Sequence, residues 1–274
     1  MPQETPRAHK RPGRRAYLLI ALFALALVLF PFLFWYYTWF GRKLSDSDLD
    51  AYFADRGKPR HIQHALVQLG ERLSRGQSAA RWYPQVITDS ASPNLEIRQT
   101  AAWIMGQDHT YAPFHEALLK LLHDPEPMVR RNAALGLASF GDPAARGELV
   151  AMLRPYTVRA PSAGPVRYRL KLGDYVNPGT LLARVGETEV RSPAPGEVRS
   201  LEHKEGDAVA PGDSLAELSV DKNHVWESLR GLYMVGQAED LEDVQRFTRP
   251  VPGLPESVAR QAALTSQAIQ ARGK

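Results

Sequence analysis

The stretch HDPEPMVRRNAALGLASFGDPAA, residues 123–145, decides the fold of this protein. Asp124 and Pro125 end one helix and begin the next, because proline fits the first turn of a helix but not its interior. The residues that follow form an apolar stripe at helical spacing, made of Val129, Ala133, Ala134 and Leu137. Gly141 can then end the helix in a left-handed conformation. The pattern predicts an amphipathic helix whose small residues let a neighbouring helix pack closely.

The centre of this helix recurs elsewhere in the chain. VRRNAAL from Val129 aligns without gaps with IRQTAAW from Ile97 and VARQAAL from Val258. Weaker copies, HIQHALVQLG from His61 and HVWESLRGLYMVG from His224, keep the apolar stripe and end in glycine. Residues 123–145 resemble a HEAT repeat of the short type that is also seen in phycobilisome-lyase-like proteins. The resemblance implies an α-solenoid, in which each repeat packs on its neighbours.

A segment of different composition interrupts the repeats, from about Thr157 to Ser219. Two halves recur within it, VRYRLKLGDYVNPGTLLARV from Val166 and VRSLEHKEGDAVAPGDSLAEL from Val198. Both follow the order strand, Gly-Asp turn, valine, Pro-Gly turn, strand, in which glycine supplies positive φ and proline presets the turn. The residues predicted to make these turns are Gly173, Asp174, Gly179, Gly206, Asp207 and Gly212.

This shared order of strands and turns resembles the biotinyl/lipoyl fold, a flattened all-β barrel-sandwich built from two such half-motifs. SPAPGEV from Ser192 resembles the start of that family's second half. Carrier members of the family hold a modified lysine at the tip of the hairpin that joins the halves. The joining stretch here, from Gly186 to Glu189, contains no lysine. The unmodified version of the fold occurs in adaptor proteins of export systems, which also have one N-terminal membrane helix.

The N-terminal region carries an apolar run, AYLLIALFALALVLFPFLFWYYTWF, from Ala16 to Phe40. It exceeds the length of about 20 residues that a helix needs to cross a bilayer. Five basic residues precede it, Arg7, Lys10, Arg11, Arg14 and Arg15. Since Lys and Arg remain on the cytoplasmic side, we expect a cytoplasmic N-terminus and an extracytoplasmic body. A cleaved signal peptide is the alternative, but it would have a shorter apolar core and a small-residue cleavage site.

These features predict a multidomain α plus β protein with a single transmembrane helix. The expected parts are a basic cytoplasmic tail at 1–15, the transmembrane helix at 16–40, HEAT-like repeats at 45–155, a biotinyl/lipoyl-like β-domain at 156–221 and further HEAT-like repeats at 222–274.

The sequence offers little for catalysis or for metal binding. It contains no cysteine, which excludes disulfides, thiolate metal sites and cysteine nucleophiles. His61 and His64 have a spacing that suits one metal, but no obvious third ligand lies nearby. Acidic pairs near Leu241 alternate with apolar residues, as on the solvated face of a helix. Phosphate-binding loops and nucleophile elbows are absent too. We therefore expect no catalytic residue, no cofactor and no metal site. We do not expect this protein to be an enzyme.

The expected function follows from the scaffolds, because helical repeats serve mainly in protein binding. Basic residues recur at equivalent repeat positions and form a candidate interaction ridge, Arg98, Arg130, Arg131 and Arg260. The ridge would meet an acidic partner or lipid headgroups; the alternative is that each arginine pairs with an acidic residue of its own repeat.

We predict a scaffold or adaptor in the inner membrane that holds other membrane or envelope proteins. Its partners would be the bilayer, through Ala16 to Phe40, and those proteins, but not nucleic acid. An export-system adaptor subunit is the alternative, and a biotin or lipoyl carrier is less favoured.

Overall fold

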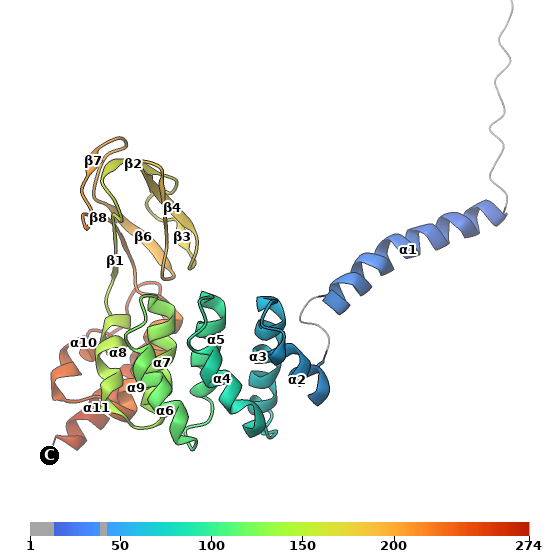
Figure 1. Cartoon of the computed structure of the whole chain (residues 1–274). Coiled ribbons are helices and arrows are strands. Elements are labelled where there is room, and N and C mark those ends of the chain that lie inside the picture. The colour runs from blue at the N-terminus through green and yellow to red at the C-terminus, as the bar shows by residue number, and fades with distance from the viewer. Residues whose placement is uncertain (1–13, 39–42, 274) are drawn as a thin grey trace, which may run out of the picture. The chain divides into compact units, whose positions relative to one another are not determined.

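The computed structural model describes residues 14–38 and 43–273, and it combines helices with β-sheet (Figure 1). The chain divides into two compact units, one ending at Ala54 and one beginning at Asp55. The first unit contains α1 (Arg14–Thr38) and α2 (Asp46–Ala54). Within α1, Tyr17–Tyr36 has a mean hydropathy of 2.7 and is long and apolar enough to cross a bilayer. Trp39 and Phe40, with which the predicted anchor ends, lie outside the described residues.

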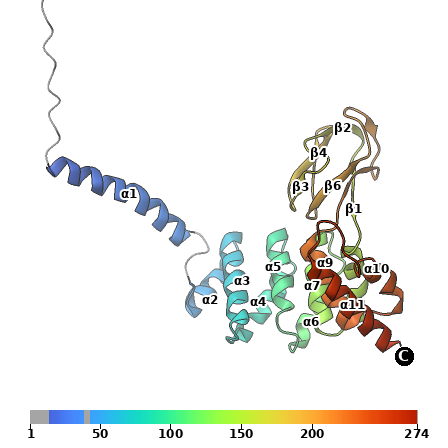
Figure 2. The same ribbon diagram turned by 180° about the vertical axis from the view of Figure 1, so that it is seen from behind.

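The second unit consists of helices that flank a β-domain. Its helices are α3 (Pro59–Ser74), η1 (Ala80–Trp82), α4 (Tyr83–Asp89), α5 (Leu95–Met105), α6 (Ala112–Leu121), α7 (Pro127–Ser139), η2 (Pro143–Ala145), α8 (Arg146–Met152), α9 (Lys222–Val235), η3 (Ala238–Asp240), α10 (Leu241–Gln245) and α11 (Glu256–Arg272). The odd-numbered helices from α3 to α11 pack side by side in chain order, and we call them the inner row. The shorter even-numbered helices pack against them (Figures 1 and 2). All copies of the sequence motif lie in the inner row.

Local sequence explains where these helices begin and end. Proline occupies the first turn of α3, α4, α6 and α7. The Asn94 side chain accepts a hydrogen bond from the Ile97 N–H at the start of α5. Gly141 has a φ of +77° after α7, and the N–H of Asp142 donates to the carbonyl of Leu137. This is the left-handed helix ending that the sequence predicted.

Small residues bring neighbouring inner-row helices close together. A Cβ atom added to Gly106, which caps the end of α5, would lie 3.0 Å from the Cα of Gly136 on α7. A Cβ on Gly231 of α9 would lie 3.5 Å from the Cβ of Ala138 on α7 and 2.9 Å from a methyl group of Leu149 on the adjacent α8. Ala133 and Ala134 in the middle of α7 are fully buried. The glycine positions therefore set the spacing of the row.

The β-domain lies between α8 and α9 in the chain. Its strands are β1 (Tyr156–Arg159), β2 (Gly164–Tyr168), β3 (Tyr175–Val176), β4 (Leu181–Val185), β5 (Thr188–Arg191), β6 (Gly196–Leu201), β7 (Ala208–Val209) and β8 (Ser214–Leu218). They form two antiparallel sheets, ordered β1-β8-β6-β3 and β5-β4-β2-β7. Each half contributes to both sheets, because β3 pairs with β6 and β7 pairs with β2. Valines and leucines from both halves share one core.

Equivalent turns in the two halves have the same geometry. The four turn glycines have φ between +86° and +88°. Asp174 accepts a hydrogen bond from the Lys171 N–H, and Asp207 accepts one from the Lys204 N–H. The N–H of Gly173 donates to the carbonyl of Val198, which lies in the other half. The Gly-Asp turns thus reverse the chain and also join the halves.

The helices that follow the β-domain in the chain pack on those that precede it and so continue the helical array. The α9 helix packs on both α7 and α8, and the Ser228 hydroxyl donates to the carbonyl of Leu149 at 2.6 Å. Arg154 after α8 pairs with Asp243 of α10 at 2.6 Å. At the base of the β-domain, Tyr156 and Leu218 are register partners, so the segment leaves the array and returns to it at one place. The Tyr175 hydroxyl donates to Asp221, the N-cap of α9, at 2.7 Å.

Replacing residues 156–219 with a short Gly-Asn-Gly linker should leave the helical array folded. Paired strand residues lie about 5 Å apart, so a short linker spans the gap. The replacement removes the hydrogen bond from Tyr175 to Asp221. Such a bond contributes about 1 kcal/mol to stability, so its loss should lower Tm by a few degrees. Far-UV circular dichroism during thermal unfolding measures this. Loss of the cooperative helical transition would show that the array depends on the β-domain.

Candidate binding groove on the inner row

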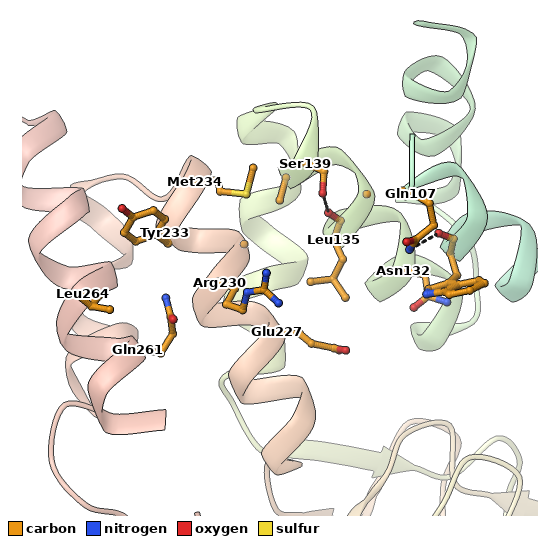
Figure 3. Close-up of a pocket in the computed structure, with 15 residues that line it drawn as sticks. Gln107, Asn132, Leu135, Ser139, Glu227, Arg230, Tyr233, Met234, Gln261 and Leu264 are labelled. Atoms are coloured by element: carbon orange, nitrogen blue, oxygen red, sulfur yellow. Dashed lines mark hydrogen bonds between the residues drawn. The ribbon is translucent and has the colours of Figure 1, made fainter. Parts of the chain in front are cut away.

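A groove of ≈590 Å³ lies on the face of the inner row formed by α5, α7, α9 and α11 (Figure 3). Its lining follows helical spacing on each helix. The lining residues are Trp103 of α5 with Gly106 and Gln107 just after it, Asn132, Leu135, Gly136, Ala138 and Ser139 of α7, Glu227, Arg230, Gly231, Tyr233 and Met234 of α9, and Gln261 and Leu264 of α11. Positions separated by three and four residues share a helix face, so each helix turns one face into the groove.

The groove has a floor of small residues and apolar walls. Gly136 and Gly231 lie on the floor, where the helices approach one another. The ring of Trp103 lies over Gly70 of α3, because a Cβ at Gly70 would come within 2.2 Å of it. Trp103 nevertheless keeps 42% of its surface exposed, and Leu264 on the far wall keeps 52%. Large apolar side chains therefore face solvent on both sides of the floor.

This exposure is concentrated in the groove. Among the described residues from Asp55 onward, the large apolar side chains that are exposed are Trp103, Tyr233, Met234 and Leu264 of the groove and Leu172 and Tyr175 of the β-domain. A contiguous apolar patch with a polar rim marks a binding surface more often than scattered apolar residues do. The inner row carries such a patch.

Two charged residues of α9, Glu227 and Arg230, lie in the same groove. The Glu227 side chain is exposed, but protein atoms around its carboxyl group and the charge of Asp221 raise its pKa, while Arg230 opposes this. Within the described part of the chain, Glu227 has no salt bridge closer than 4.0 Å.

No group of three His, Asp or Glu side chains that could hold a metal ion occurs among residues 14–38 and 43–273. His61 pairs with Asp55 at 2.9 Å, and His64 is buried on the same helix. Of the acidic residues near Leu241, Asp240 binds Arg146 and Asp243 binds Arg154. These carboxylates join η3 and α10 to α8 and to the residues just after it, and they have a structural role.

Three of the four arginines predicted as an interaction ridge are engaged within the protein. Arg98 binds Asp124 through two nitrogens, at 2.7 and 3.2 Å, and Arg130 binds Glu148 at 3.0 Å. Each also donates to two carbonyls of the preceding loop. Arg131 is buried and donates to His224 of α9. These contacts favour the alternative of internal pairing, and Arg260 alone of the four is exposed.

The groove was missed in the sequence analysis, although its signal is present there. Trp103, Leu135 and Leu264 occupy the last position of the three aligned motifs, and all three line the groove. A large apolar residue at a position outside the buried stripe of every copy marks a second apolar face. The contribution of α9 has no such signal, because its motif copy is weak.

Comparison with known proteins agrees with the helical architecture. The sequence profile of the family described as HEAT repeats matches residues 84–163, which include the helices α5 to α8. The chain is also similar to a protein of Escherichia coli strain K12 named "Uncharacterized protein YqeB", with 41% identity over 61 residues. The match covers 22% of this chain and 11% of that protein, so the chain spans about a tenth of this curated relative.

Proposed function

We propose that this protein is a membrane-anchored extracytoplasmic scaffold that binds a protein partner in the groove of its inner row. The concentration of exposed apolar side chains in that groove carries the proposal. HEAT arrays present many side chains at fixed spacing along one surface, which suits protein recognition. The groove combines this surface with a small-residue floor that admits bulky side chains of a partner.

The location follows from the N-terminal helix. An apolar span in α1 follows Arg14 and Arg15, and more basic residues precede them in the sequence. This asymmetry supports a cytoplasmic N-terminus and an inner-membrane anchor that keeps the repeat array on the extracytoplasmic side. A partner in the same membrane or at its surface is then within reach.

We further propose that the β-domain is a biotinyl/lipoyl-like barrel-sandwich that has a structural role. The pairing of β3 with β6 and of β7 with β2 supports this, since it builds one two-sheet domain from the two half-motifs. Val185 pairs with Thr188, so the tip of the β4–β5 hairpin consists of Gly186 and Glu187. Because this tip has no lysine, a carrier function has no attachment point.

The test compares two matched leucine substitutions in the full chain. Leu264→Asp places a charge in the groove, and Leu172→Asp places one on the β-domain, where the leucine is 60% exposed. Chemical crosslinking in native membranes, followed by mass spectrometry, is expected to recover partners with Leu172→Asp and to lose them at least tenfold with Leu264→Asp, since a hot-spot residue contributes 2 kcal/mol or more. Equal recovery with both variants would contradict the proposal.

A further inference from the structure

We propose that the groove binds an amphipathic α-helix of the partner, which crosses the inner row and places a basic residue against Glu227. This rests on the proposed function and specifies the class of partner.

The spacing of the inner row favours a helix over an extended strand. Packed helices lie about 8–10 Å apart. Two turns of a helix rise about 10.8 Å, so apolar residues about seven positions apart meet successive inner-row helices. Side chains on one face of a β-strand recur every ~6.6–6.8 Å, which is shorter than the distance between neighbouring inner-row helices. Leu135 on α7 and Leu264 on α11 line the groove from helices that lie two positions apart in the inner row.

The shape of the groove agrees with a helical ridge. Gly136 and Gly231 lie on the floor between the apolar walls of Trp103 on α5 and Leu264 on α11. A row of bulky apolar residues on one helix face fits such a depression, as ridges fit grooves in helix packing. The amides of Gln107 and Gln261 at the sides suit the polar flanks of an amphipathic helix.

Charge complementarity fixes the middle of the proposed helix. Glu227 lies on α9, between α7 and α11, and has no salt bridge within the described residues. The protein atoms around its carboxyl group and the charge of Asp221 raise the pKa of Glu227, and Arg230 opposes this only in part. A Lys or Arg of the partner at this point would gain a charge-assisted contact. A flat anionic membrane would instead select a cationic surface, which this groove lacks.

The test is photo-crosslinking of the full chain in native membranes, with p-benzoylphenylalanine at Leu135 in one variant and at Leu264 in another. The crosslinked residues on the partner are then mapped by mass spectrometry. The two sites lie two helix spacings apart, so a helical partner is expected to be marked at residues about 11–14 apart. An extended partner would be marked about six residues apart, which would overturn the proposal. Crosslinks to this chain itself, or to lipid, would overturn it as well.

A second measurement tests the proposed contact between Glu227 and a basic residue of the partner. The captured segment, made as a synthetic peptide, is titrated against the full chain in neutral phosphatidylcholine nanodiscs. Glu227→Lys is expected to weaken binding about tenfold, because it juxtaposes like charges, and the effect should shrink at high salt. Leu172→Asp serves as control and should change nothing. An unchanged affinity for Glu227→Lys would overturn the basic-residue assignment.

The outcomes separate the two proposals. If Leu264→Asp abolishes partner recovery but the partner is marked in extended spacing, the scaffold function stands and the helical partner is wrong. If recovery does not depend on the groove, both fail.

Discussion

Replacing Asp124 with Ala is expected to lower the free energy of unfolding of the repeat array by about 3 kcal/mol, because it leaves a largely desolvated arginine, Arg98, without its partner. The Asp124 carboxylate accepts hydrogen bonds from Arg98 at 2.7 and 3.2 Å, and the two side chains are 6% and 15% exposed. The same carboxylate accepts a bond from the Glu126 N–H in the turn before α7. The substitution therefore removes an ion pair and a turn contact together.

Arg98 shows that the pair is electrostatically favourable. The hydrogen bond with Asp124 is the main reason that the pKa of Arg98 is raised, although burial opposes it. After Asp124→Ala, Arg98 retains its contacts with the carbonyls of Ser92 and Pro93 but loses its counter-charge. Urea unfolding of the full chain in detergent micelles, followed by far-UV circular dichroism, measures the loss.

Arg260 provides the matched control. It belongs to the third motif copy, as Arg98 belongs to the first, but it lies exposed on α11. Arg260→Ala is expected to change stability by no more than about 0.5 kcal/mol. If Asp124→Ala were equally mild, the pairing of Arg98 would be incidental, and the arginines would again be candidates for a binding ridge.

The repeat architecture was predictable because it depends on local spacing. VRRNAAL and its copies place small residues where neighbouring helices touch, and every copy lies in the inner row. The mixed α and β fold and the apolar N-terminal helix are confirmed, and the HEAT repeats are supported over residues 84–163. A helix and its face can be derived from period and composition, since both are properties of a short segment.

The groove depends on long-range packing, which the sequence pattern does not contain. Glu227 and Met234 line the groove only because α9 packs on α7, although the β-domain separates these two helices in the sequence. The arginines illustrate the same limit. Their spacing shows that Arg98 and Arg130 are equivalent, but not that both turn back onto the carbonyls of their own preceding loops.

The contact between α7 and α9 contains a histidine that should make the protein sensitive to acid. His224, next to the N-cap of α9, accepts a hydrogen bond at Nδ1 from Arg131 at 2.8 Å. Burial, together with the charge of Arg131, lowers the pKa of His224 from 6.5 to about 4, and Asp221 opposes this. Neutral imidazole fits the site, whereas imidazolium would face the Arg131 guanidinium and could no longer accept its proton.

Acidification from about pH 6.5 to pH 4 is therefore expected to lower the stability of the array by about 3 kcal/mol through His224, since one pKa unit corresponds to 1.36 kcal/mol. The depressed folded pKa sets the sign: the contribution is complete above the unfolded value of 6.5 and is lost as the pH falls toward 4. His224→Gln keeps an acceptor for Arg131 but does not titrate. Urea unfolding at several pH values measures the effect. The His224→Gln variant should lose less stability than the wild type between pH 6.5 and pH 4. The control His109→Gln changes an exposed histidine and should follow the wild type. Parallel curves for His224→Gln and the wild type would mean that the buried contact between Arg131 and His224 does not couple proton binding to folding.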